Sequence, residues 1–113
     1  MTTIEDKRSV HRYKIFLQGI AGWESGHNLD LEVVDISTEG ARLRAIKGFP
    51  IKEKDVLIIL IKGKRKCKLK AEVKWCKEQE RFIEFGVKFL NLDIKTREEL
   101  VYLISDYALN DLL

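Results

Sequence analysis

Residues 66–76 alternate between polar and apolar side chains, and this pattern constrains the fold more than any other feature of the chain. Successive side chains of a β-strand point to opposite faces, so a period of two predicts a strand with one buried and one solvated face. The expected buried face consists of Cys67, Leu69, Ala71, Val73 and Trp75. Residues 81–90 repeat the pattern with Ile83, Phe85, Val87 and Phe89. Both segments therefore predict a half-buried antiparallel sheet.

Six β-type runs occupy residues 13–20, 29–36, 41–45, 56–61, 66–76 and 81–90. Turn-forming residues such as Gly26, Pro50 and Gly63 separate them. Strands joined by such short connections pair antiparallel. A small sheet must protect its edges, and closure into a barrel does so. The fold class is therefore expected to be mainly β, a six-stranded antiparallel β-barrel.

The hydrophobic period changes after residue 95. Five side chains then fall on one helical stripe: Leu100, Leu103, Ile104, Tyr107 and Leu112. Thr96 followed by Glu99 is typical of a capping box at a helix start. We expect a C-terminal helix over about residues 96–112 that covers the barrel as a lid. Residues 1–12 show no amphipathic period and are expected to form a flexible leader, so that residues 13–113 form a single domain.

Composition and charge narrow the class of protein. With 113 residues, the chain is long enough to bury a core without disulfides or a structural metal. No apolar run approaches the roughly 20 residues that span a bilayer, so no membrane span is expected. The net charge of +3 is uneven, because residues 91–113 carry five acidic and two basic residues, leaving +6 for residues 1–90. The basic character therefore belongs to the front of the chain.

The cysteines indicate a compartment. Cys67 and Cys76 would stand roughly 30 Å apart on one strand and on opposite faces, so they form no disulfide there. With His11 and His27 they match no zinc spacing. We expect a reduced, cytoplasmic protein without metal or cofactor. No nucleophile–histidine spacing or glycine-rich phosphate loop is present, so we expect no enzyme.

Two short motifs carry the candidate site. Arg8 and Arg12 lie four residues apart before the first expected strand, and the second strand ends in the run Asp35-Ile36-Ser37-Thr38-Glu39-Gly40. Asp35 and Ser37 share a strand face by the period of two, and Gly40 permits a tight reversal. Taken singly, the first motif is also typical of a solvated charged segment and the second of a local turn. Their joint order and spacing favour a binding site.

Together with the run Phe85-Gly86-Val87-Lys88-Phe89, these motifs resemble the PilZ domain family, whose members bind the bacterial second messenger cyclic di-GMP (c-di-GMP). The resemblance implies a PilZ-like split barrel that holds the ligand against the arginine leader. The residues it implies as ligand contacts are Arg8, Arg12, Asp35, Ser37 and Gly40, with Lys7, His11 and Arg42 as secondary contacts. His11 is equally consistent with an exposed bystander, and Lys7 bears on whether one ligand or an intercalated pair binds. The resemblance further implies relay to an unidentified downstream protein in motility, adhesion or biofilm control.

The chemistry of these residues suits the ligand. The planar guanidinium of arginine binds guanine O6 and N7, or a phosphate, through two parallel hydrogen bonds. A carboxylate such as Asp35 accepts hydrogen bonds from guanine N1–H and N2–H, while the Ser37 hydroxyl adds a short contact. This set would select guanine over adenine.

Two other functions remain open. The Lys62–Lys70 ribbon has six basic residues in nine, which would suit a small RNA-binding barrel. Such a protein needs exposed aromatic rings, whereas Trp75 is expected in the core, so no nucleic-acid partner is expected; Trp23 stays unassigned. The second alternative is a ligand-free PilZ-like adaptor that acts through protein contacts, which the arginine pair disfavours.

Overall fold

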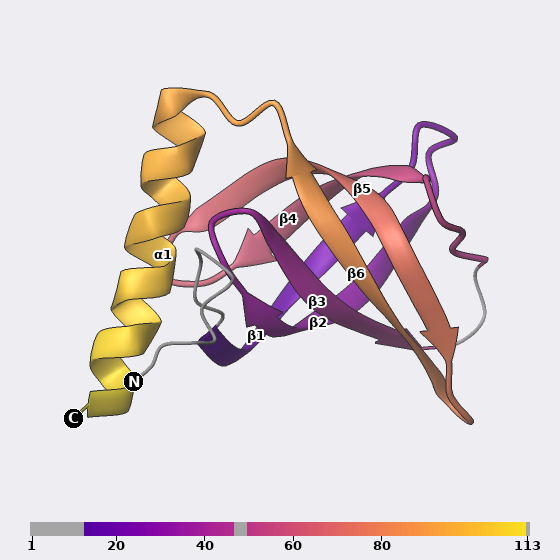
Figure 1. Ribbon diagram of the computed structural model, residues 1–113, viewed down its shortest axis with the longest axis horizontal. Helices are drawn as coiled ribbons and strands as arrows, with labels where there is room; N and C mark the ends of the chain where they lie inside the picture. Colours follow the sequence, from indigo (N-terminus) through magenta and orange to yellow (C-terminus); the bar gives the residue numbers. More distant parts are fainter. Residues whose placement is uncertain (1–12, 47–49, 113) are drawn as a thin grey trace, which may run out of the picture.

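The computed structural model describes residues 13–46 and 50–112, with side chains over 17–46 and 50–106. Its elements are β1 (Tyr13–Gly22), β2 (Asn28–Ile36), β3 (Gly40–Ile46), β4 (Val56–Lys62), β5 (Lys66–Glu78), β6 (Phe82–Leu90) and α1 (Ile94–Leu112). The predicted leader, residues 1–12, lies outside the described part. Figure 1 shows the strands wrapping around one another, with α1 standing at one end.

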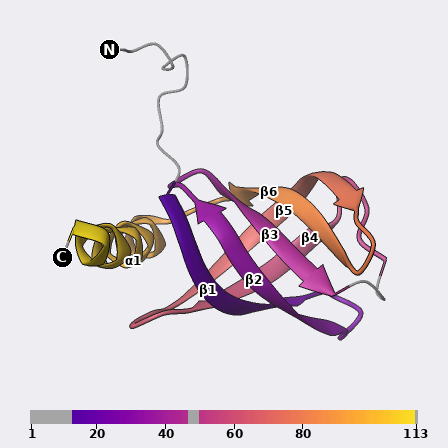
Figure 2. The same ribbon diagram turned by 90° about the horizontal axis from the view of Figure 1, so that it is seen from below.

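The strands form a closed barrel in the order β1-β2-β3-β6-β5-β4, and every neighbouring pair is antiparallel. This confirms the expected six-stranded antiparallel barrel with a C-terminal helix. The pairing of β1 with β4 closes the ring, so no strand is left with an unpaired edge along its whole length. In Figure 2, β1, β2 and β3 run side by side on the near side of the barrel.

The interior is built from the alternating faces that the sequence predicted. Cys67, Leu69, Ala71 and Val73 of β5 are buried, as are the four predicted residues of β6. The helix adds Leu100, Leu103 and Ile104 to the same core, and its contacts fall on β5 and β1. Side chains of the other two stripe residues, Tyr107 and Leu112, lie outside the described part. The predicted lid is therefore confirmed over the first three turns of the helix.

A β-bulge in β5 overturns the expected position of Trp75. The register with β6 shifts between Val73 and Trp75, because one extra residue stands on β5 at this point. The alternation consequently reverses, and Trp75 is 38% exposed instead of buried. Cys76 packs against the core instead, on the same side as Cys67, and not on the opposite face as expected.

The start of α1 also differs from its prediction. The helix begins at Ile94, and the backbone N–H of Thr96 donates to Asp93 Oδ1 at 2.7 Å. Asp93 is therefore the N-cap, and the Thr96–Glu99 capping box was wrong. This hydrogen bond lowers the pKa of Asp93, since it stabilises the ionised carboxylate. In the part of the chain with described coordinates, α1 is not apolar enough to cross a membrane.

Candidate functional site

The turn between β2 and β3 is organised by Ser37. Its backbone N–H donates to the carbonyl of Gly40 at 2.8 Å, and its hydroxyl oxygen accepts from the N–H groups of Glu39 and Gly40 at 3.1 and 3.2 Å. The hydroxyl also lies 3.3 Å from the Gly40 carbonyl, to which it donates. Ser37 is 2% exposed. The side chain thus fixes the shape of the loop that the motif encodes.

Gly40 is required here by a close approach between two strands. A Cβ atom at this position would lie 2.3 Å from the carbonyl oxygen of Val87, in the neighbouring β6. The φ of Gly40 is not in the left-handed region, so the tight reversal expected from the sequence does not explain why glycine is needed at this position. A further bond, from the N–H of Phe89 to the carbonyl of Glu39 at 2.8 Å, ties the turn to β6. The motif turn is therefore held on two sides.

Asp35 reaches the outer face of the barrel through a second β-bulge. The β2–β3 register shifts between Val33 and Asp35, which places Asp35 opposite Arg42. Arg42 Nη2 lies 2.9 Å from Asp35 Oδ2, and Arg42 Nε lies 3.2 Å from Glu84 Oε2. The two carboxylate side chains are largely covered, at 8% and 17% exposure, whereas Arg42 is 35% exposed. One guanidinium therefore holds two acidic side chains of different strands together.

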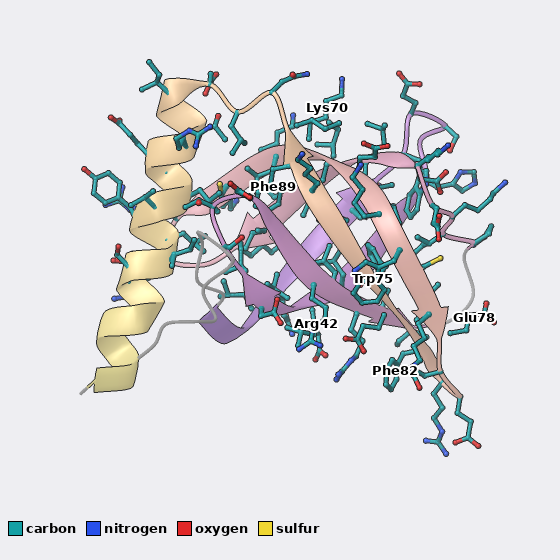
Figure 3. The ribbon with its side chains drawn as sticks, in the orientation of Figure 1. Arg42, Lys70, Trp75, Glu78, Phe82 and Phe89 are labelled. Atoms are coloured by element: carbon teal, nitrogen blue, oxygen red, sulfur yellow. The ribbon has the colours of Figure 1, made fainter. Side chains whose placement is uncertain are left out.

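Trp75 lies on the same outer face as Arg42. Gly86 of β6 is the Cα partner of Arg42 on one side and of Trp75 on the other. A Cβ atom at Gly86 would stand 2.2 Å from Trp75 Nε1, so the indole covers the glycine. Figure 3 shows both labelled side chains on this part of the barrel. Sequence reasoning missed Trp75 as a surface residue; the signal for it was Gly86, which interrupts an otherwise regular strand and leaves room for an aromatic ring.

A cleft of about 760 Å³ opens farther along the outer surface. Arg44, two residues after Arg42 on β3, stacks over the ring of Phe82 at 4.6 Å within it. Its other polar lining residues are Gln18, Asp30, Glu32, Lys62 and Arg81. Asp35, Ser37 and Gly40 do not line this cleft, so it is a feature separate from the motif turn. Because the turn carries the motif, we place the candidate site at the turn and the Arg42 side chain.

Acidic, histidine and cysteine side chains do not gather into a potential metal site anywhere in residues 13–46 and 50–112. Both cysteines are free thiols. Burial, with a smaller contribution from Glu99, raises the pKa of Cys67 to about 11, so this thiol stays protonated at neutral pH. It is a structural core residue.

The sequence profile of the PilZ domain matches residues 6–106. The chain belongs to the PilZ domain family. No curated protein sequence matches it significantly. The resemblance drawn from the two motifs is therefore confirmed at the level of the family. Asp35, Ser37, Gly40 and Arg42 come together in the PilZ fold as described above, whereas Lys7, Arg8, His11 and Arg12 fall outside the described residues.

Solved structures share this fold. The PilZ domain with c-di-GMP of YcgR from Escherichia coli has a TM-score of 0.76 at 14% identity, covering 88% of this chain and 91% of that one. The inhibitor of motility MotI/DgrA of Bacillus subtilis has a TM-score of 0.75 at 14% identity, covering 91% of this chain and 52% of that one. The MrkH–c-di-GMP complex of K. pneumonia has a TM-score of 0.75 at 15% identity, covering 92% of this chain and 52% of that one. The chain thus spans about half the length of the last two proteins, and at these identities the likeness shows the fold.

Proposed function

We propose that this PilZ domain is a cytoplasmic receptor that binds c-di-GMP and relays its binding to a partner protein in motility, adhesion or biofilm control. The observation that carries the proposal is the motif turn of Asp35, Ser37 and Gly40, built on a PilZ barrel whose structural neighbours include c-di-GMP complexes. The proposed role is binding and not catalysis. Arg8 and Arg12 supply the remaining ligand contacts, with Lys7, His11 and Arg42 as secondary ones.

The start of β1 supports the joint use of both motifs. Tyr13 is the Cα partner of Ile36, and Lys14 is the partner of Asp35. Arg12 immediately precedes Tyr13 in the sequence. Because consecutive Cα atoms are about 3.8 Å apart, Arg12 is attached next to the residue of β1 that pairs with the end of β2. This supports the proposal that two motifs separated by 22 residues in the sequence act on one ligand.

Each described residue has a distinct role in the proposal. Arg42 engages one oxygen of Asp35, and a carboxylate accepts about four hydrogen bonds in all, so guanine N1–H and N2–H are suitable further donors. Ser37 and Gly40 act by shaping the turn, since the hydroxyl of Ser37 is engaged within it. The exposed indole of Trp75 provides a flat surface on which a guanine base stacks.

Calorimetric titration tests the proposal directly. We expect saturable binding of c-di-GMP and none of cyclic di-AMP or GTP. Each charge-assisted contact contributes roughly 1.5–3 kcal/mol, so Arg8→Ala or Arg12→Ala should weaken binding by about 10- to 150-fold, and the double variant should abolish it. Arg97→Ala, on the exposed side of α1, is the matched control and should bind like the unmodified chain. Absence of heat and of competition at micromolar ligand would overturn the receptor and favour the adaptor.

Relay to a partner is proposed to depend on ordering of the segment that carries the two arginines. Hydrogen exchange of residues 1–12 with and without c-di-GMP tests this step. We expect slower exchange in the complex, confined to this segment and the motif turn. Equal exchange in both states would contradict ordering as the signal, even where calorimetry shows binding.

A further inference from the structure

Strand β4 is apolar on both of its faces. Leu57, Ile59 and Ile61 point into the barrel and are at most 1% exposed. The residues that alternate with them point outward, where Val56 is 44% and Ile58 40% exposed. The solvated face of an antiparallel strand normally carries polar side chains. An outward apolar stripe on β4 is therefore a feature that the barrel core does not explain.

Three lysines of β5 border this stripe. Leu60 pairs with Lys68 and Ile58 with Lys70, so these two basic side chains stand directly beside apolar ones, and Lys66 pairs with Lys62 at the end of the stripe. Lys66, Lys68 and Lys70 are exposed, and none of these three forms an ion pair with the residues that the structure describes. We call this surface the β4–β5 face, made of Val56, Ile58, Leu60, Lys66, Lys68 and Lys70. It combines unpaired positive charge with exposed apolar area.

Strand β4 lies across the barrel from β3, the strand that carries Arg42 of the candidate ligand site. In the closed order β1-β2-β3-β6-β5-β4, β4 and β3 are three steps apart in either direction, which is the largest separation that six strands allow. Figure 3 agrees, because Lys70 and Arg42 point to opposite sides of the molecule. A molecule bound at one surface therefore leaves the other accessible.

We propose that the β4–β5 face docks an acidic, amphipathic segment of a partner protein. Acidic side chains of that segment pair with the three lysines, and its apolar side chains cover Val56 and Ile58. Charge complementarity selects the acidic partner, and the apolar stripe requires that the partner also bring apolar side chains. The docking surface is independent of the nucleotide site, so it serves a receptor and a ligand-free adaptor alike.

The chemistry of the face disfavours other classes of macromolecule. Single-stranded nucleic acids need aromatic side chains on which bases stack, and the six residues of the face include none. Lipid-binding segments insert apolar side chains roughly 5–10 Å into the headgroup region, whereas Val56 and Ile58 are more than half covered by their neighbours. A peptide segment that lies along the sheet matches both the apolar stripe and the charge.

The experiment uses the full chain, labelled with ¹⁵N, and a synthetic helical peptide with leucines along one face and glutamates elsewhere. We expect chemical-shift changes confined to β4 and β5. A scrambled peptide of equal composition, with its leucines spread around the helix, should bind at least about 5-fold more weakly, because it no longer presents one apolar face. No saturable shifts with the first peptide, or shifts centred elsewhere, would overturn the proposal.

Matched variants test the two components of the face. Lys68→Glu/Lys70→Glu should weaken peptide binding about 10-fold, whereas Lys77→Glu/Lys95→Glu, with the same change of charge at other exposed lysines, should lower it much less. Ile58→Thr keeps a β-branched residue on the strand and should weaken binding about 5-fold, against no change for Ile46→Thr, another exposed isoleucine. Equal effects within either pair would contradict docking at this face.

Further measurements distinguish the acidic peptide from other occupants of the β4–β5 face, and test that the nucleotide site is separate. An RNA 20-mer or anionic phosphatidylserine vesicles that shift the same residues more strongly than the peptide would assign the face to that class instead. Dimerisation in sedimentation, lost in Ile58→Thr, would assign it to a second copy of the chain. The variants should bind c-di-GMP as the unmodified chain does, so failure of peptide docking and failure of nucleotide binding are distinguishable.

Discussion

The indole of Trp75 lies over Gly86, its cross-strand neighbour on β6, so closely that a Cβ atom at the glycine would stand 2.2 Å from Trp75 Nε1. Gly86 therefore leaves the space that the ring occupies. On the other side of Gly86 stands Arg42, which binds Asp35 at 2.9 Å. The indole and the guanidinium thus form neighbouring parts of one outer surface.

Replacing this glycine should displace the ring. We expect Gly86→Ala to lower the free energy of unfolding by about 1–2 kcal/mol, since the added methyl and the indole compete for one space. In a Trp75→Ala background the same change should be neutral or stabilising, because alanine then fits the strand better than glycine. A double-mutant cycle by urea denaturation measures the coupling. Additive effects would show that the ring does not rest on Gly86 in solution.

Local periodicity was sufficient to predict most of the barrel. The alternation in β5 and β6 reflects which side chains are apolar, so it identified Leu69, Val73, Phe85 and Val87 as core from the residues alone. Two bulges were not predictable in this way. A bulge is defined by two residues on one strand facing one on its partner, and the residues around Lys74 carry no local sign of it. Trp75 was therefore placed on the wrong face.

The candidate site was only partly predictable, and the reason is the same. Asp35, Ser37 and Gly40 were identified by their spacing, but their interactions depend on other strands: Asp35 on Arg42 of β3, and Gly40 on the carbonyl of Val87 in β6. The helix start was displaced because Asp93 and Thr96 are both good N-caps, and sequence alone does not rank them.

Arg42 should stabilise the fold by neutralising the two carboxylates that it bridges. In Arg42→Leu, Asp35 and Glu84 lose their shared cation, and both are largely buried. We expect the free energy of unfolding to fall by about 1–2 kcal/mol, less than for a fully buried pair because Arg42 is partly exposed. Adding Glu84→Gln to the variant should restore part of the loss. Arg97→Leu, an exposed arginine of α1, is the control, and an equal loss there would contradict a specific role for Arg42.

Gly40 should tolerate no side chain. The obstacle to a Cβ atom is a backbone carbonyl at 2.3 Å, so relief requires β3 and β6 to separate. We expect Gly40→Ala to lower the free energy of unfolding by about 2–3 kcal/mol and to speed amide exchange along the β3–β6 pairing. Gly26→Ala meets no neighbouring atom but keeps a φ of 95°, so its loss should stay near about 1 kcal/mol. A milder effect at Gly40 than at Gly26 would refute the steric explanation.

The burial of Cys67 should make the stability of the fold depend on pH in the alkaline range. Burial, followed by the charge of Glu99, raises its pKa from 9.0 to about 11, so between these values the unfolded chain releases the thiol proton while the folded chain keeps it. A raised folded-state pKa means that the contribution to stability is complete below pH 9 and is lost as the pH rises toward 11. Urea denaturation across this window should therefore show that the free energy of unfolding falls more steeply with pH for the unmodified chain than for Cys67→Val. The difference in slope should correspond to at most about one proton released on unfolding.

A second measurement tests the burial of Cys67. In the folded chain at pH 8 its thiol should react with Ellman's reagent only as fast as the protein opens, because the reactive thiolate is scarce and the side chain is 0% exposed. Parallel pH profiles for the two proteins, together with rapid labelling of Cys67 in the folded chain, would mean that this thiol is accessible to solvent and does not belong to the core.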